Sequence, residues 1–152
     1  MDELSRLMQF EERHRRLLAR LGLVVAATVV IEVLNDIGRP LKGARILVLG
    51  VAYKHGVGDT RESPAHEIIS TLLRWGADVA YADPHVPTFQ LEGMELKAVD
   101  LTDEILQRAD CTLILTDHPE FDFRRIVELA PLVVDTRNAT WGITAPGRVI
   151  RL

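Results

Sequence analysis

A strand, a polar loop and a helix start in immediate succession constrain the fold more than any other part of this chain. An apolar run over 46–49 ends in Gly50, a polar loop follows, and an amphipathic helical pattern covers 66–75. These features, in this order, form the place where open α/β sheets bind ligands. The loop carries Lys54 and Arg61, and cations at such a sheet edge suit a phosphate ligand.

Strands and helices alternate along most of the chain. The sequence predicts strands at 45–49, 78–81, 94–99, 111–115, 132–134 and 149–152, and helices at 66–75, 102–109 and 123–129. Ser63-Pro64 is a typical helix start and Gly76 a typical helix end. The alternation predicts an α/β fold with a Rossmann-like, doubly wound parallel sheet.

Residues 1–38 differ in pattern from the α/β domain predicted at 39–152, and they predict an N-terminal helical segment. Charges of both signs alternate over 2–20, which is typical of a solvated helix. Residues 23–36 predict a strongly apolar helix that ends near Gly38. Such a helix packs on its own domain or on another chain, so we expect a homo-oligomer.

The composition limits the classes of protein to which the chain can belong. Its 152 residues suffice for one domain, and 47% hydrophobic residues suffice for a core. A net charge of -4 without an evident basic face argues against nucleic-acid binding. The first 20 residues are charged and the apolar run at 21–31 is short, so we expect neither a signal peptide nor a membrane span.

Cys111 is the single cysteine, which excludes an internal disulfide and a multi-cysteine metal site. It lies inside an apolar strand, so we expect a core residue and not a nucleophile. One cysteine fits a reducing cytosol, and we expect a cytoplasmic protein without a metal.

Polar clusters follow four of the predicted strands. They are Tyr53-Lys54 with Asp59 and Arg61, Asp83-Pro84, Thr116-Asp117-His118, and Asp135-Thr136-Arg137-Asn138. The carboxyl ends of parallel strands meet at one edge of a sheet, so we expect these clusters to form one ligand site. The alternative is that they are only solvated loop ends.

Two cations after the first strand have two interpretations each. Lys54 either binds a phosphate or sugar oxygen or is a surface lysine. Arg61 either forks onto a diphosphate or pairs with Asp59 or Glu62 at the helix start.

The later clusters also leave alternatives open. Arg137 either holds an anionic or carbonyl group or pairs with Asp135. Asp83, which precedes Pro84, is more typical of a turn than of a catalytic residue. His118 is either an acid or base or, as a loop histidine without a known partner, structural.

Several familiar motifs are absent. Gly56 and Gly58 are followed by Thr60-Arg61, so the dinucleotide motif G-x-G-x-x-G is missing. The chain also has no G-x-x-x-x-G-K-[ST] and no G-x-S-x-G motif. The sequence therefore predicts no catalytic residue.

The linked motifs resemble those of a known family. Gly50-Val51-Ala52-Tyr53-Lys54, Asp59-x-Arg61-Glu62-Ser63-Pro64-Ala65, Asp83-Pro84, Thr116-Asp117-His118 and Val133-Val134-Asp135-Thr136-Arg137-Asn138 occur in this order. Over about residues 24–152 they resemble the C-terminal domain of the UDP-glucose/GDP-mannose dehydrogenases, and in detail the UDP-N-acetylhexosamine branch.

This resemblance implies a role for the chain within a larger oxidoreductase. In that family an N-terminal Rossmann domain binds NAD, a central region supplies a catalytic cysteine and dimer contact, and the C-terminal domain binds the UDP part of a nucleotide sugar. The resemblance implies that Lys54 and Arg137 contact the sugar nucleotide and that Tyr53 shapes the site. It implies that Arg61 reaches toward the NAD pyrophosphate.

The chain also departs from the family pattern. It lacks the Rossmann motif and the segment with the catalytic cysteine, and residues 1–22 do not match the central region. His55 stands where proline is common, and Gly58 where an acidic residue is common. We therefore expect a UDP-sugar-binding part of an NAD-dependent dehydrogenase that is inactive alone and binds no NAD by itself. The alternatives are a stand-alone UDP-sugar-binding module and a scaffold without a ligand.

Overall fold

A five-stranded parallel sheet forms the centre of the molecule. The computed structural model describes residues 22, 25–144 and 148–152. The sheet has the order β2-β1-β5-β6-β7, with every neighbouring pair parallel. Its strands are β1 (Arg45–Leu49), β2 (Asp78–Ala82), β5 (Cys111–Ile114), β6 (Leu132–Asp135) and β7 (Arg148–Arg151). The predicted α/β fold with a parallel sheet is confirmed.

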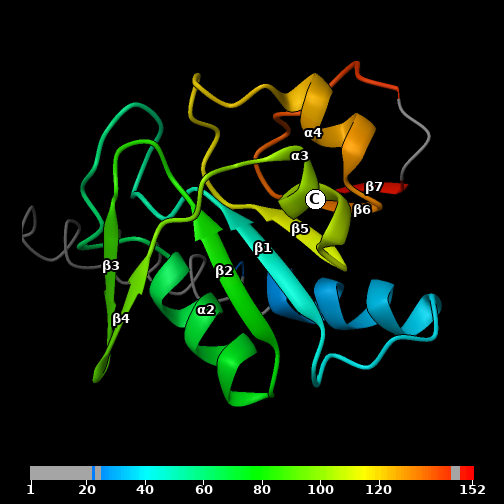
Figure 1. Ribbon diagram of the computed structural model, residues 1–152, viewed down its shortest axis with the longest axis horizontal. Coiled ribbons are helices and arrows are strands. Elements are labelled where there is room, and N and C mark those ends of the chain that lie inside the picture. The colour runs from blue at the N-terminus through cyan, green and yellow to red at the C-terminus, as the bar shows by residue number, and fades with distance from the viewer. Residues whose placement is uncertain (1–21, 23–24, 145–147) are drawn as a thin grey trace, which may run out of the picture.

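Helices cover both faces of this sheet (Figure 1). The helix at residues 25–36 and α2 (Ala65–Arg74) pack on one face, and α3 (Asp103–Arg108) and α4 (Phe123–Leu129) pack on the other. Side chains alternate along β1, so that Ile46 and Val48 join the first core and Leu47 and Leu49 join the second. The sheet is therefore doubly wound, as predicted.

The apolar N-terminal helix packs on its own domain. Val30 and Leu34 are fully buried in the core that the helix shares with the sheet and α2. The helix ends before Gly38, which has a positive φ of 70°. The sequence left open whether this helix packs on its own domain or on another chain. In the structure it packs on its own domain, so its apolar face is no longer a reason to expect self-association.

Two further expectations concern the same part of the chain. The polar helix predicted at 2–20 lies outside the described residues. The division of the chain at residues 38 and 39 stays a prediction. Among the described residues, no helix is both long enough and apolar enough to cross a bilayer.

A β-hairpin beside the main sheet was only half predicted. It consists of β3 (Thr88–Leu91) and β4 (Met94–Lys97), which pair antiparallel. From the sequence we predict only a strand at 94–99 and no strand directly before it. Phe89 is fully buried against Tyr81, and Gly93 has a φ of 70° in the turn. Glu92-Gly93 between two apolar residues was the available hairpin signal.

Gly50, directly after β1, stands where two loops approach each other most closely. Its φ is 81°, a left-handed conformation that L side chains rarely adopt. A Cβ at this position would lie 2.4 Å from Thr116 Cβ and 2.7 Å from the Thr116 carbonyl oxygen. Its backbone N–H donates to the Ala82 carbonyl at 2.9 Å. Three strand ends therefore meet at a position that only glycine fits.

We expect Gly50→Ala to lower the free energy of unfolding by about 2–5 kcal/mol, because backbone strain and overpacking add. Gly43→Ala is the matched control, since Gly43 has a φ of 80° and nothing within 4 Å of an added Cβ. Strain alone predicts a loss of about 1–2 kcal/mol there. Urea unfolding of both variants measures the difference, and equal losses would contradict the proposed close approach.

Candidate functional site

The loops after β1, β2, β5 and β6 lie at one side of the sheet, which we call the carboxyl edge (Figure 1). These loops carry the four polar clusters predicted from the sequence. The strand order changes direction between β1 and β5, since β2 and β5 flank β1 on opposite sides. Open α/β sheets bind ligands at such a switch point. The fold therefore brings the predicted clusters together where a ligand site is expected.

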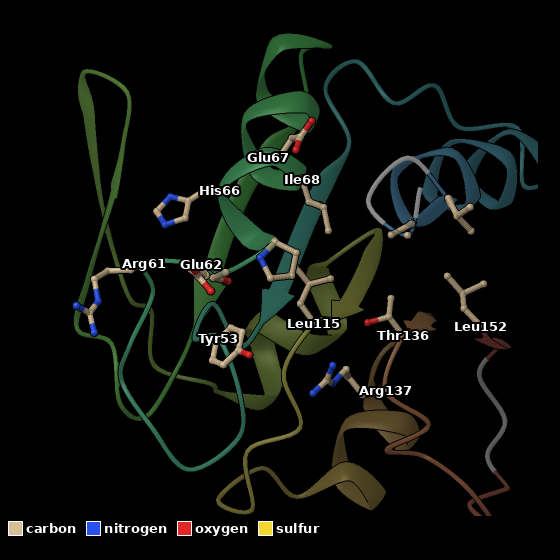
Figure 2. A pocket seen from close by; sticks show the side chains of 15 residues that line it. Tyr53, Arg61, Glu62, His66, Glu67, Ile68, Leu115, Thr136, Arg137 and Leu152 are labelled. Carbon is tan, nitrogen blue, oxygen red and sulfur yellow. The ribbon is translucent and has the colours of Figure 1, made fainter. Parts of the chain in front are cut away.

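A pocket of about 810 Å³ opens at this edge, between the loop after β1, the start of α2 and the N-terminal helix. The residues that line it are Gly22, Val25, Ala26, Tyr53, Arg61, Glu62, Ser63, Pro64, His66, Glu67, Ile68, Leu115, Thr136, Arg137 and Leu152. Figure 2 shows Tyr53 and Arg137 on the same side of the pocket, below Leu115. About half of the lining residues are apolar and the others are polar or charged, including two arginines and the carboxylates of Glu62 and Glu67.

Three of the four predicted site residues border this pocket. Tyr53, Arg61 and Arg137 line it, whereas Lys54 does not. Lys54 is exposed on the same loop, next to Tyr53. Neither His66 nor Glu67 is among the residues predicted from the sequence, although both line the pocket from the first turn of α2.

The Arg61 side chain forms an exposed ion pair. Its Nη2 lies 2.7 Å from Asp59 Oδ2 and its Nε donates to Asp59 Oδ1 at 3.1 Å. The side-chain hydrogen bond from Arg61 lowers the pKa of Asp59 to about 2. Pairing with Asp59 was one of the two interpretations of Arg61. The side chain stays 87% exposed, so the guanidinium keeps donors that face solvent.

Arg137 pairs with a different carboxylate from the one considered in the sequence. Its Nε lies 3.5 Å from Asp117 Oδ1, so an ion pair with the Asp135 side chain is not what the structure contains. Asp117 Oδ1 also lies 3.7 Å from His55 Nδ1. The reason is that Asp135 faces inward and binds the backbone of its own loop.

Asp135 is a buried carboxylate at the end of β6. Its oxygens accept from the backbone N–H groups of Arg137 and Ala139 and from both the N–H and the hydroxyl of Thr140, at 2.6–3.2 Å. Burial raises the pKa of this carboxyl, but the hydrogen bonds outweigh burial and leave the pKa below its ordinary value. Asp135 therefore fixes the loop that presents Arg137.

We expect Asp135→Asn to lower the free energy of unfolding at pH 7 by about 1–3 kcal/mol, because the amide cannot accept all these hydrogen bonds. The hydrogen bonds hold the pKa of Asp135 in the folded protein below its ordinary value of 3.8, so the carboxylate stabilises the fold above that pH. This contribution is lost as the pH falls through the folded pKa, so the difference in stability between variant and wild type should shrink as the pH is lowered below the ordinary range of an aspartate.

Urea unfolding at pH 7 and at a series of lower pH values measures the free energy of unfolding of both proteins. Asp100→Asn is the control, since Asp100 is exposed, and its effect should stay within about 0.5 kcal/mol. Equal stability of Asp135→Asn and wild type at pH 7 would contradict the assigned role.

A buried pair of side chains joins the loops after β1, β2 and β5. His118 Nε2 lies 2.9 Å from Asp83 Oδ2, and both side chains are fully buried. Asp83 Oδ2 also accepts from the backbone N–H groups of Val51 and Ala52, at 2.8 and 3.3 Å. His118 Nδ1 accepts from the Gly56 N–H at 3.0 Å. His118 thus has the partner that the sequence could not identify, and its surroundings are structural.

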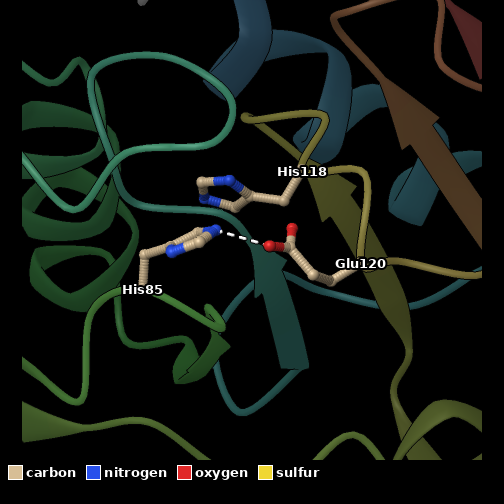
Figure 3. A group of neighbouring side chains, drawn as sticks. All are labelled: His85, His118 and Glu120. Carbon is tan, nitrogen blue, oxygen red and sulfur yellow. Dashed lines mark ion pairs between the residues drawn. The ribbon is translucent and has the colours of Figure 1, made fainter.

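Two further side chains, those of His85 and Glu120, lie close to His118 (Figure 3). The ligand atoms of these three residues lie within 4.8 Å of one another, a spacing that could suit a metal ion. Both His118 nitrogens already have protein partners, however. His85 Nε2 lies 2.7 Å from Glu120 Oε1, close enough for an ion pair but misaligned for a hydrogen bond. As arranged, the group does not offer three free ligands.

Cys111 lies in β5 and is fully buried. Burial raises the pKa of its thiol to about 12, with a smaller contribution from Asp110. A thiol in this state is not a nucleophile at neutral pH. The prediction that Cys111 is a core residue is confirmed.

Comparison with known proteins agrees with this geometry. Residues 47–141 match the model of the UDP-glucose/GDP-mannose dehydrogenase family, UDP binding domain. The chain is 35% identical over 117 residues to the UDP-N-acetyl-D-mannosamine dehydrogenase of Methanococcus maripaludis, covering 72% of this chain and 26% of the relative. It is 39% identical over 108 residues to the UDP-glucose 6-dehydrogenase of Rickettsia bellii, covering 64% and 24%.

Solved structures give the same similarity. A UDP-D-ManNAc dehydrogenase from Pyrococcus horikoshii aligns with a TM-score of 0.69 at 26% identity, covering 85% of this chain and 30% of that one. A UDP-glucose dehydrogenase from Pyrobaculum islandicum aligns with a TM-score of 0.65 at 26% identity, covering 87% and 29%. The chain thus spans 24–30% of the length of these four proteins.

Proposed function

The chain belongs to the UDP-glucose/GDP-mannose dehydrogenase family, and we propose that the carboxyl edge of its sheet binds the UDP part of a nucleotide sugar. The observation that carries the proposal is the pocket of about 810 Å³ at the switch point, bordered by Tyr53 and Arg137. Guanidinium groups bind diphosphates through paired donors. The apolar lining, which includes Leu115, suits the less polar parts of a nucleotide.

Each predicted site residue has a role in this proposal. Arg137, oriented by Asp117, binds the diphosphate or the sugar. Lys54 lies outside the pocket lining and acts as a mobile charge that reaches the ligand from the same loop. Tyr53, about half exposed, shapes the pocket wall. These roles agree with those that the family resemblance implies.

We propose further that this unit works within an NAD-dependent nucleotide-sugar 6-dehydrogenase. The partners would be an NAD-binding domain and a central domain with the catalytic cysteine, and NAD would supply the hydride acceptor. The exposed guanidinium of Arg61, which pairs with Asp59 and points away from the other lining residues in Figure 2, is open to the anionic pyrophosphate of a cofactor held by a neighbouring domain. The relatives' names include both UDP-N-acetyl-D-mannosamine and UDP-glucose, so the sugar stays open.

A second candidate is a stand-alone module that binds a UDP-sugar without chemistry. The buried thiol of Cys111 agrees with both candidates, because the first one places the nucleophile in another domain. A homo-oligomeric state and a cytoplasmic location stay predictions.

Calorimetric titration with UDP, UDP-glucose and UDP-N-acetylglucosamine tests the binding. We expect binding that Lys54→Ala and Arg137→Ala each weaken by about tenfold, the loss typical of a charge-assisted contact. Arg108→Ala is the control, since Arg108 pairs with Glu104 on α3, away from the pocket lining. Absence of binding to all three ligands would refute the proposal.

Turnover distinguishes the chain from a complete enzyme. We expect no NADH formation when the chain alone is mixed with NAD and a UDP-sugar, because it carries no dinucleotide motif and its one thiol is buried. Absorbance at the wavelength of NADH measures this, with a complete family enzyme as the positive control. Steady NADH formation would contradict the proposal that the oxidation of the sugar depends on other domains.

A further inference from the structure

We propose that His118 is a positioning residue for the ligand-binding loop and that it acts only as the neutral Nε2–H tautomer. The loop concerned is residues 51–59, between β1 and the turn before α2, and it carries Tyr53 and Lys54. The ligand part of this inference depends on the proposed function, whereas the loop contact itself can be tested without a ligand.

The two hydrogen bonds of His118 define its protonation state. A backbone N–H can only donate, so the 3.0 Å contact from Gly56 N requires an unprotonated Nδ1. The Asp83 carboxylate can only accept, so the 2.9 Å contact to Nε2 requires a proton there. Both requirements are met together only in the neutral ring with its proton on Nε2.

The loop is fixed at its two ends by other contacts. Asp83 Oδ2 accepts from the N–H groups of Val51 and Ala52 at the first end. The Tyr53 N–H donates to the Asp59 carbonyl at 2.7 Å and closes the loop on itself. Between these contacts, the Gly56 N–H bonds to His118. Among the described residues, this hydrogen bond and the 3.7 Å ion pair between His55 and Asp117 are the side-chain contacts that reach the middle of the loop from the loop after β5.

Protonation of the ring would turn this contact from attractive to repulsive. A proton on Nδ1 would face the Gly56 N–H, and two donors cannot bond. The Asp83 bond would persist, so the ring would keep its place while the middle of the loop lost its anchor. Histidine is the side chain that changes charge between pH 5 and 8.

Other ionisable groups lie next to the His118 ring and also influence its protonation. Asp83 contacts Nε2, and the His85 ring lies 4.9 Å from the His118 ring, centroid to centroid. Glu120 lies beside both histidines (Figure 3). The ring of Phe121 packs against the His118 ring, with 5.8 Å between the ring centroids. The experiment must separate His118 from two neighbouring imidazoles, that of His85, which pairs with Glu120, and that of His55, which pairs with Asp117.

Titration with UDP-N-acetylglucosamine at pH 7.5 and 5.5 tests the ligand part. A UDP-sugar is the suitable probe because it lacks the terminal phosphate that titrates near pH 6. We expect the affinity of the wild type to fall by about tenfold at the lower pH, as expected for loss of one buried hydrogen bond. His85→Gln should keep this pH dependence.

Two variants separate positioning from a purely structural role. The Asn oxygen in His118→Asn can take the place of Nδ1, so this variant should bind equally at both pH values. His118→Gln places its amide near Nε2 and leaves the Gly56 N–H without an acceptor, so it should bind weakly at both. Wild-type affinity that is equal at both pH values, or His118→Gln that binds like the wild type, would overturn the ligand part.

NMR of the chain without ligand tests the contact directly. We expect ring ¹⁵N shifts of His118 that report a proton on Nε2 at pH 7.5, and a Gly56 amide that is protected from exchange at pH 7.5 and loses protection at pH 5.5. A proton on Nδ1, or Gly56 protection that does not change with pH, would overturn the inference. Absence of UDP-sugar binding with the expected NMR result would instead refute only the proposed function.

Discussion

The carboxylate of Asp83 is the interaction on which the carboxyl edge depends. It is nearly fully buried, and it accepts from the loop after β1, from the His85 N–H and from His118. A buried charge is costly unless donors surround it, so the loops must keep these positions for the charge to remain satisfied. Asp135 imposes the same requirement on the loop that presents Arg137. The pocket therefore has walls that are fixed before a ligand arrives.

The fold was largely predictable because its signals are local. The Ile, Val and Leu runs of β1 and β5, the proline before α2 and the glycine after it each act within a few residues. The hairpin was the exception. Its first strand is four residues long, and what stabilises it is the burial of Phe89 against Tyr81, which no local pattern reveals.

The site was predictable as a place but not as a set of contacts. Topology alone brings strand ends to one edge, so the four clusters could be placed together from the sequence. Topology alone could not identify which side chains form hydrogen bonds or ion pairs with one another. Asp83 and His118 are 35 residues apart and Asp117 and Arg137 are 20 apart, and the sequence offers several carboxylates as partners for His118 and for Arg137. Geometry also decided which cations border the pocket and left Lys54 outside its lining.

The position of Cys111 gives the molecule a built-in reporter of its own opening. The thiol lies in β5, between β1 and β6, at the middle of the parallel sheet. An alkylating reagent can reach it only when the elements packed on this face of the sheet move away, because the folded thiol is both covered and protonated. As the chain has one cysteine, its rate of modification would measure how often this core opens, uncomplicated by any second site.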